Sequence, residues 1–133
     1  MSVNLEVKKI SEKERWVGGN KTFLIEGNII HVVVSGEQTT ELATIQNKIN
    51  LGLASMVEGK ISYLIDLNQS GKSSPEARSI WSKACEYENT YKVAVFGLHP
   101  VAKVIASFVF GITRKKDMRF FCLEKEARSW LLS

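Results

Sequence analysis

The spacing of apolar residues changes several times along the chain and divides it into elements. Near the amino end, residues 22–26 and 29–35 are short runs rich in β-branched residues, with Gly27-Asn28 between them. Two such runs around a tight turn predict an antiparallel hairpin. From residue 37 to about residue 57, apolar positions recur at steps of three and four, which predicts a helix with one apolar face. The residues of that face are Leu42, Ile45, Ile49, Leu53 and Met56.

Strands and helices alternate in the rest of the chain. Residues 61–67 and 92–97 are nearly continuous apolar runs of strand length, which is typical of strands buried on both faces. Residues 118–122 form a further predicted strand. Pro75 and Pro100 stand where helices should begin, because proline suits the first helical position. The predicted helices cover residues 75–89, 101–112 and 124–132, and residues 68–74 form a polar loop.

The order of these elements, ββαβαβαβα, predicts an α/β fold. Strands that alternate with helices imply a mostly parallel sheet with right-handed crossovers and packed helices, here preceded by the N-terminal antiparallel hairpin. No Gly/Ser-rich linker, repeat or low-complexity segment interrupts the sequence, so we expect one domain at residues 1–133. Within it, residues 1–15 form either a loose arm or an additional edge element of the sheet.

Composition is that of a soluble globular protein, with 44% hydrophobic and 24% charged residues. No run approaches the roughly 18 to 20 apolar residues that a membrane span needs. The first fifteen residues are polar and charged rather than an apolar signal segment, which predicts a cytoplasmic protein. Cys85 and Cys122 lack a CxxC partner and a histidine at ligand spacing, so neither a disulfide nor a metal site is expected.

Charge is modest overall and uneven along the chain. The net charge of +4 is far from the dense basic face of a nucleic-acid-binding protein, so we expect no nucleic-acid partner. Residues 1–59 carry six basic and seven acidic side chains, whereas residues 60–133 carry twelve and seven. Any attraction to anions therefore belongs to the second half of the chain.

The order of elements resembles the STAS domain (sulfate transporter and anti-sigma factor antagonist), and residues 59–132 resemble the SpoIIAA-like family in particular. The segments that carry the resemblance are ISYLIDLNQSGKSSPEAR, KVAVFGLHPVAKVIASFVFG and MRFFCLEKEARSWL. The fold of this family is related to the CRAL-TRIO lipid-binding domains. The resemblance implies a small cytoplasmic binding domain with no established reaction and no cofactor, for which dimerisation is one option. Membrane association and binding of a small amphiphile have been proposed for the family, with the helix that matches residues 101–112 as its mobile part.

One departure from the anti-sigma factor antagonists concerns their phosphorylated serine. Those proteins carry an Asp-Ser-Ser-Gly stretch at the start of the helix that follows the central strand. The matching residues here, 71–76, read Gly-Lys-Ser-Ser-Pro-Glu, with no aspartate before the serines and a proline after them. This difference argues against phosphorylation-controlled partner switching and favours Ser74 as a helix cap.

A candidate ligand site lies at the predicted carboxyl edge of the sheet, where open α/β proteins bind ligands. Its residues are Asp66, Ser73, Ser74 and His99. Two helix amino termini at this edge would favour an anion or a polar head group. The simpler interpretation of His99 is a capping or packing residue, and that of His31, in its alternating strand, is a half-exposed sheet residue. No phosphate-binding loop and no nucleophile with a base and an orienting acid can be identified, so we assign no catalytic residue and expect a protein that is not an enzyme.

The predicted helix at residues 101–112 has few charges and is followed at once by a basic cluster. A helical wheel centred on Val101 predicts a core stripe that includes Val104, Ile105, Phe108 and Ile112. It places Phe110 opposite this stripe and beside Lys103. An exposed apolar face next to basic residues suits an anionic membrane surface. The same pattern fits plain core packing, or an interface with a second copy or another protein. The residues of this expected surface are Lys103, Phe110, Arg114, Lys115, Lys116 and Arg119.

Two functions are therefore compatible with the sequence. The first is a non-catalytic regulatory or ligand-binding domain that binds a lipid or amphiphile and associates peripherally with the inner membrane face through residues 101–112 and the basic cluster. The alternative is a protein–protein interaction module that forms a homodimer or binds a partner, like the anti-sigma factor antagonists.

Overall fold

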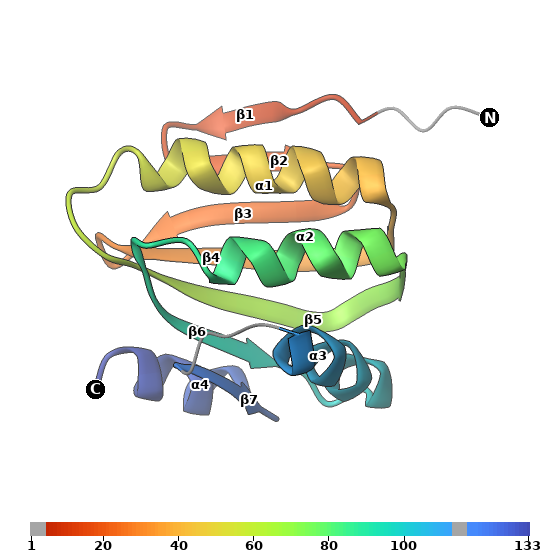
Figure 1. Ribbon diagram of the computed structural model, residues 1–133. Coiled ribbons are helices and arrows are strands. Elements are labelled where there is room, and N and C mark those ends of the chain that lie inside the picture. Colours follow the sequence, from red (N-terminus) through yellow and green to blue (C-terminus); the bar gives the residue numbers. More distant parts are fainter. Residues whose placement is uncertain (1–4, 113–116) are drawn as a thin grey trace.

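A computed structural model of the chain describes residues 5–112 and 117–133 (Figure 1). Over these residues, seven strands form one sheet whose spatial order is the order of the sequence. The strands are β1 (Lys8–Ser11), β2 (Glu14–Val17), β3 (Asn20–Ile25), β4 (Ile29–Gln38), β5 (Ile61–Ser73), β6 (Thr90–Phe96) and β7 (Met118–Phe121). The helices are α1 (Thr40–Ala54), α2 (Pro75–Cys85), α3 (Pro100–Ile112) and α4 (Glu124–Leu131). Strands β1 to β4 pair antiparallel, and β4 to β7 pair parallel.

Helices α1, α2 and α3 lie on one face of the sheet, and α4 lies on the other (Figure 1). Each of the first three connects two neighbouring parallel strands, always in the same direction along the sheet. Right-handed crossovers therefore place all three on the same face. Helix α4 follows the last strand and packs against the reverse face, below β5 and β6.

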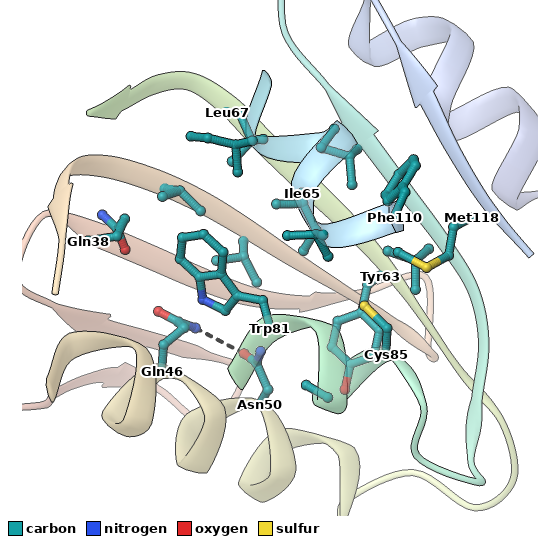
Figure 2. A pocket seen from close by; sticks show the side chains of 18 of the residues that line it. Gln38, Gln46, Asn50, Tyr63, Ile65, Leu67, Trp81, Cys85, Phe110 and Met118 are labelled. Atoms are coloured by element: carbon teal, nitrogen blue, oxygen red, sulfur yellow. Dashed lines mark hydrogen bonds between the residues drawn. The ribbon is translucent and has the colours of Figure 1, made fainter. Parts of the chain in front are cut away.

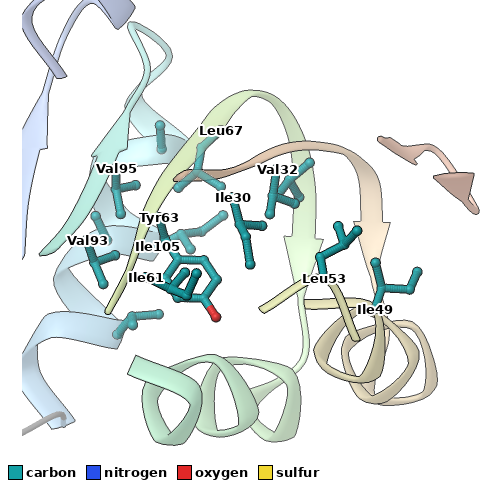
Figure 3. Packing of buried hydrophobic residues seen from close by; sticks show 14 of the residues in the cluster. Ile30, Val32, Ile49, Leu53, Ile61, Tyr63, Leu67, Val93, Val95 and Ile105 are labelled. Carbon is teal, nitrogen blue, oxygen red and sulfur yellow. The ribbon is translucent and has the colours of Figure 1, made fainter. Parts of the chain in front are cut away.

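The two faces of the sheet carry separate apolar cores. The larger core fills the space between the sheet and the three helices (Figure 3). On β4, Ile30 and Val32 point into it, whereas Ile29 belongs to the smaller core under α4. This division follows from the alternation of side chains along a strand. The predicted α/β fold, with antiparallel strands first and parallel strands after them, is confirmed.

Two regions of the sheet differ from the prediction. For residues 1–15 the sequence allows either a loose arm or an additional edge element. The structure places β1 and the start of β2 there, as additional strands at the edge of the sheet. The predicted polar loop at residues 68–74 is wrong, because β5 continues as far as Ser73. Its polar end pairs with an equally extended end of β4, with Ser35 opposite Gln69 and Gln38 opposite Ser73. Backbone pairing thus lengthens both strands where the side chains show no apolar alternation.

The helix boundaries follow from local capping. Thr39 caps α1 and Ser74 caps α2, since each side-chain oxygen accepts a hydrogen bond from a backbone amide three residues later. The predicted end of the second helix at residue 89 is wrong, because residues 86–89 turn the chain into β6. Among the described residues, no helix is both long enough and apolar enough to cross a membrane.

Candidate functional site

A cavity of about 90 Å³ lies between the sheet and helices α1, α2 and α3 (Figure 2). Apolar side chains of β4, β5 and β6 line it on one side, and those of α2 and α3 on the other. It is larger than the roughly 10–15 Å³ that one water needs and smaller than the roughly 300–1,000 Å³ of pockets that enclose drug-sized ligands. Its size therefore suits a small apolar group, such as the end of an aliphatic chain.

One end of the cavity is lined by amide side chains: Asn20 of β3, Gln38 of β4, and Gln46 and Asn50 of α1. Asn20 and Gln38 are 1% exposed and Gln46 is 4% exposed. The Nδ2 of Asn20 donates hydrogen bonds to the Oε1 atoms of Gln38, at 3.0 Å, and Gln46, at 3.2 Å. Its Oδ1 accepts a hydrogen bond from Nε2 of Gln38 at 3.1 Å. The three buried amides therefore satisfy one another and make this end polar without adding charge.

Asn50 keeps hydrogen-bonding capacity at the same end. Its Oδ1 accepts a 2.9 Å hydrogen bond from Nε2 of Gln46 (Figure 2). The same Gln46 nitrogen donates to Oγ1 of Thr22 at 2.7 Å, which fixes its orientation. Asn50 is half-buried, and no hydrogen bond from its Nδ2 is found among the described residues. This group is therefore available to a carbonyl, hydroxyl or carboxylate oxygen of a ligand.

The other end of the cavity is apolar and approaches the surface. Tyr63, Cys85, Phe110 and Met118 lie there (Figure 2). Burial raises the pKa of Tyr63 to about 12, so its phenol stays neutral even at pH values well above the physiological range. Phe110 and Met118 are half-buried, as are Cys85 and Trp81 on α2. These four lining residues, Trp81, Cys85, Phe110 and Met118, are called the rim below, because each of them is partly reached by solvent.

The expectation that Phe110 faces outward is wrong. The buried face of α3 differs from the expected face by about a quarter turn around the helix axis. Ala102 and Ala106 face the sheet and are at most 3% exposed, while Val104, expected in the core, is 54% exposed. Small side chains let the helix approach the sheet closely, and a Cβ atom at Gly97 would lie only 2.6 Å from that of Ala102. Phe110 consequently packs at the edge of the core and lines the cavity.

The other residues of the expected surface do not form one patch among the described residues. Lys103 is exposed on the outer side of α3. Arg119 is exposed on β7, with its guanidinium 5.5 Å from the ring centre of Trp130 on α4, and so belongs to the reverse face of the sheet. Arg114, Lys115 and Lys116 lie outside the described residues.

The four residues of the expected edge site fall into two groups. Asp66 is linked through Asn68 to the segment that carries His99. Asn68 donates hydrogen bonds to Oδ1 of Asp66, and its own Oδ1 accepts one from the backbone N–H of Leu98, next to His99. His99 caps α3, with its Nδ1 accepting a hydrogen bond from the backbone amide of Val101 at 3.2 Å.

The serines are engaged elsewhere, because Ser73 lies seven residues further along β5 than Asp66, up to about 23 Å in an extended strand. Ser73 Oγ accepts from Arg78, and Ser74 Oγ caps α2 and hydrogen-bonds Thr40. The capping roles considered for Ser74 and His99 are thus present. The described sheet also lacks a reversal of strand order, and hence the crevice that such a reversal opens.

Sequence reasoning missed the cavity and its amide end. One signal was present: Gln46 falls on the apolar stripe of the first helix, four residues after Leu42 and three before Ile49. A polar residue on a core-facing stripe needs a buried hydrogen-bond partner. Asn20 and Gln38 lie at the ends of strands and carry no comparable signal.

Comparison with known proteins identifies the family. Residues 23–133 match the model of a domain of unknown function, DUF7793. The chain belongs to the DUF7793 family. No curated protein matches it.

The DUF7793 chain is also similar to the crystal structure of an uncharacterized protein of the DUF3478 family, with a SpoIIAA-like fold, from Shewanella loihica PV-4. The TM-score is 0.60 at 17% sequence identity, and the similarity covers 98% of each chain. The DUF7793 chain therefore has the SpoIIAA-like fold that its sequence resembles.

Proposed function

We propose that this DUF7793 domain is a ligand-binding domain without catalytic activity that takes the apolar part of a small amphiphile into the cavity under α2 and α3. The observation that carries the proposal is an apolar cavity inside the core that has a polar end and a half-buried rim. Well-packed cores have few voids larger than a water molecule. A cavity of about 90 Å³ beside the rim is therefore larger than the voids that a well-packed core usually has, and this excess volume favours a role in binding.

The chemistry of the lining defines the ligand class. The amide end carries no charge, so it suits a neutral or singly charged oxygen group better than a multiply charged phosphate. Asn50 offers a free N–H donor, and Tyr63 remains a neutral phenol. The remaining lining is aliphatic, aromatic and sulfur-containing, which favours a flexible hydrocarbon chain. A fatty acid, fatty alcohol or related single-chain amphiphile meets these requirements.

We propose that the domain takes up such a ligand from a membrane while bound peripherally to the inner membrane face. Two rim residues, Phe110 and Met118, flank Arg114, Lys115 and Lys116 in the sequence. Each basic residue near an anionic bilayer contributes on the order of 1 kcal/mol of attraction. The rim and the basic cluster would then meet the membrane together.

The proposal is tested by native mass spectrometry and calorimetry with saturated fatty acids of increasing chain length. Ala106→Leu fills the cavity from α3 and is expected to weaken binding at least about tenfold. Val104→Leu on the exposed side of the same helix is the matched control and should bind as the wild type does. Asn50→Ala removes one hydrogen bond, worth about 0.5–1.5 kcal/mol, and should weaken binding roughly 2- to 12-fold. Unchanged binding by Ala106→Leu would refute the cavity as the site.

Membrane contact is tested separately by flotation with neutral and anionic vesicles at low and moderate salt. Charge reversal of Arg114, Lys115 and Lys116 should abolish salt-sensitive flotation with anionic vesicles and leave fatty-acid binding in solution unchanged. Flotation that survives the reversal would assign membrane contact to another surface.

A second candidate function, binding to a second copy or another protein, is favoured by one observation. Leu98 and Val104, before and on α3, are 68% and 54% exposed. Val104 lines a shallow hollow with Pro100, Lys103 and Ser107. If this surface makes a dimer, sedimentation should show self-association that Val104→Lys abolishes. A monomer at all concentrations would exclude the dimer.

A further inference from the structure

Three side chains with metal-binding atoms meet on the reverse face of the sheet, away from the cavity. His31 comes from β4, Asp66 from β5 and Glu124 from the first turn of α4. One nitrogen or oxygen atom of each lies within 4.8 Å of the corresponding atoms of the other two. His31 and Asp66 each stand two residues after a member of the smaller core, Ile29 and Leu64, which fixes both on the face that α4 covers.

The imidazole of His31 has an unsatisfied nitrogen. Its Nε2 is buried and has no hydrogen-bond partner among the described residues. The ring lies beside Phe23 with a centroid distance of 5.9 Å, which limits its movement. Buried polar atoms nearly always have a partner. Nε2 needs an acceptor if it carries the ring proton, and a hydrogen-bond donor or a metal ion if it does not. The other two groups of the cluster are carboxylates. Neither of them accepts a hydrogen bond from Nε2 in the structure, and they donate no proton when they are ionised.

Both carboxylates are oriented by further hydrogen bonds. Oδ1 of Asp66 accepts from the backbone N–H of Asn68 at 2.9 Å and from its Nδ2 at 3.0 Å. Oε2 of Glu124 accepts from Nε of Arg128 at 2.6 Å. Each carboxylate therefore has a second oxygen available for coordination. Outer hydrogen bonds of this kind orient the ligands of metal sites and are a regular part of them.

We propose that His31, Asp66 and Glu124 bind a divalent transition-metal ion. One imidazole and two carboxylates form a nitrogen–oxygen ligand set that suits Zn²⁺ and its neighbours in the first transition row. Three protein ligands leave a position for water or another ligand, as in zinc sites that are not purely structural.

Bonds of roughly 2.0–2.2 Å place tetrahedral ligand atoms about 3.4 Å apart. The ligand atoms, now within 4.8 Å of one another, would therefore approach each other by up to about 1.4 Å on binding. Glu124 can supply this movement, because its side chain is partly exposed and lies on the first turn of a short helix. The ion would then tie α4 to β4 and β5.

The test is calorimetric titration of chelator-treated full-length protein with Zn²⁺, together with metal analysis and thermal unfolding. We expect one Zn²⁺ per chain and a higher melting temperature with Zn²⁺ than without it. His31→Gln should lower the affinity at least about 100-fold and remove the thermal shift. Asn68→Ala, which removes one orienting hydrogen bond, should lower the affinity about tenfold, within the 10–100-fold range typical of such partners.

Two control variants separate this site from adventitious binding. His99→Gln changes the second of the two histidines in the sequence, and Cys122→Ser removes an exposed thiol close in sequence to Glu124. Both should bind Zn²⁺ as the wild type does. With Co²⁺, visible d–d bands without a thiolate charge-transfer band are expected.

Equal affinity in His31→Gln, loss of binding in Cys122→Ser, or no binding of Zn²⁺, Co²⁺ or Mn²⁺ by the wild type would each overturn the proposal. The circular dichroism of metal-free His31→Gln is measured alongside, and a native spectrum with lost binding supports the assignment. Should His31→Gln not fold, Glu124→Gln at the half-exposed end of the cluster replaces it, with the same expected loss. The result is independent of the cavity, because Ala106→Leu lies on the other face of the sheet and should bind Zn²⁺ normally.

Discussion

Replacing Asn20 by alanine tests whether the buried amides at the end of the cavity act as one hydrogen-bonded unit. The substitution leaves two fully buried acceptors, Oε1 of Gln38 and Oε1 of Gln46, without the partner that they have in the wild type. A buried group without its partner costs about 1–3 kcal/mol, so the expected loss is about 2–6 kcal/mol. The backbone N–H of Ser35 also loses its bond to Asn20, but it is only partly buried and can bind water. Against a total stability of about 5–15 kcal/mol for a domain, this loss is large.

Urea unfolding followed by circular dichroism measures this loss, with Asn89→Ala as control. Asn89 is exposed, so the same substitution there should change stability by less than about 0.5 kcal/mol. The triple variant Asn20→Leu, Gln38→Leu, Gln46→Leu removes donors and acceptors together and should recover much of the stability, since an apolar set leaves few unpaired groups. A loss below about 1 kcal/mol in Asn20→Ala, or a triple variant less stable than the single one, would refute the reasoning.

Three further outcomes are expected. Gly97→Ala should destabilise the fold by about 1–3 kcal/mol in urea unfolding, because its Cβ would lie 2.6 Å from that of Ala102, and adding Ala102→Gly should restore part of the loss. In a spectroscopic titration, one tyrosine should ionise only near pH 12, and this titration step should be absent from Tyr63→Phe. Because burial raises the pKa of Tyr63, the contribution of its neutral phenol to the free energy of unfolding is complete below pH 10 and is lost as the pH rises towards 12. Burial lowers the pKa of His31 below 6.5, so the contribution of its neutral imidazole to the free energy of unfolding is complete above pH 6.5 and is lost as the pH falls. NMR titration of the metal-free protein measures this pKa, and a value above 6.5 would contradict the prediction.

The fold was largely predictable because local sequence patterns indicate most elements of its parallel half. Continuous apolar runs marked the central strands, and Pro75 and Pro100 marked the starts of α2 and α3, where the structure has them. The ends of β4 and β5 were missed because their polar residues are held by pairing between the two strands, which no local pattern reports. Strands β1 and β2 likewise depend on a neighbour, since they are short and mostly polar.

The candidate site was less predictable because a cavity is a property of several elements at once. The helical wheel assigned the apolar face of α3 by side-chain size and took Val101 as its centre. The actual buried face is set by the close approach of Ala102 and Ala106 to the sheet. This approach places Phe110 at the rim and leaves Val104 exposed to solvent. The cluster of His31, Asp66 and Glu124 depends on three elements far apart in the sequence, and their ligand spacing appears only in the folded chain.

The agreement between the order of strands in the sheet and their order in the sequence has a consequence for synthesis. Each strand pairs with the one made immediately before it, so the sheet can be extended at one edge as the chain leaves the ribosome. The antiparallel strands β1 to β4 need only short turns, and each of β5, β6 and β7 follows a helix that lies on the same face of the sheet. None of the seven described strands has to insert between two others that are already paired.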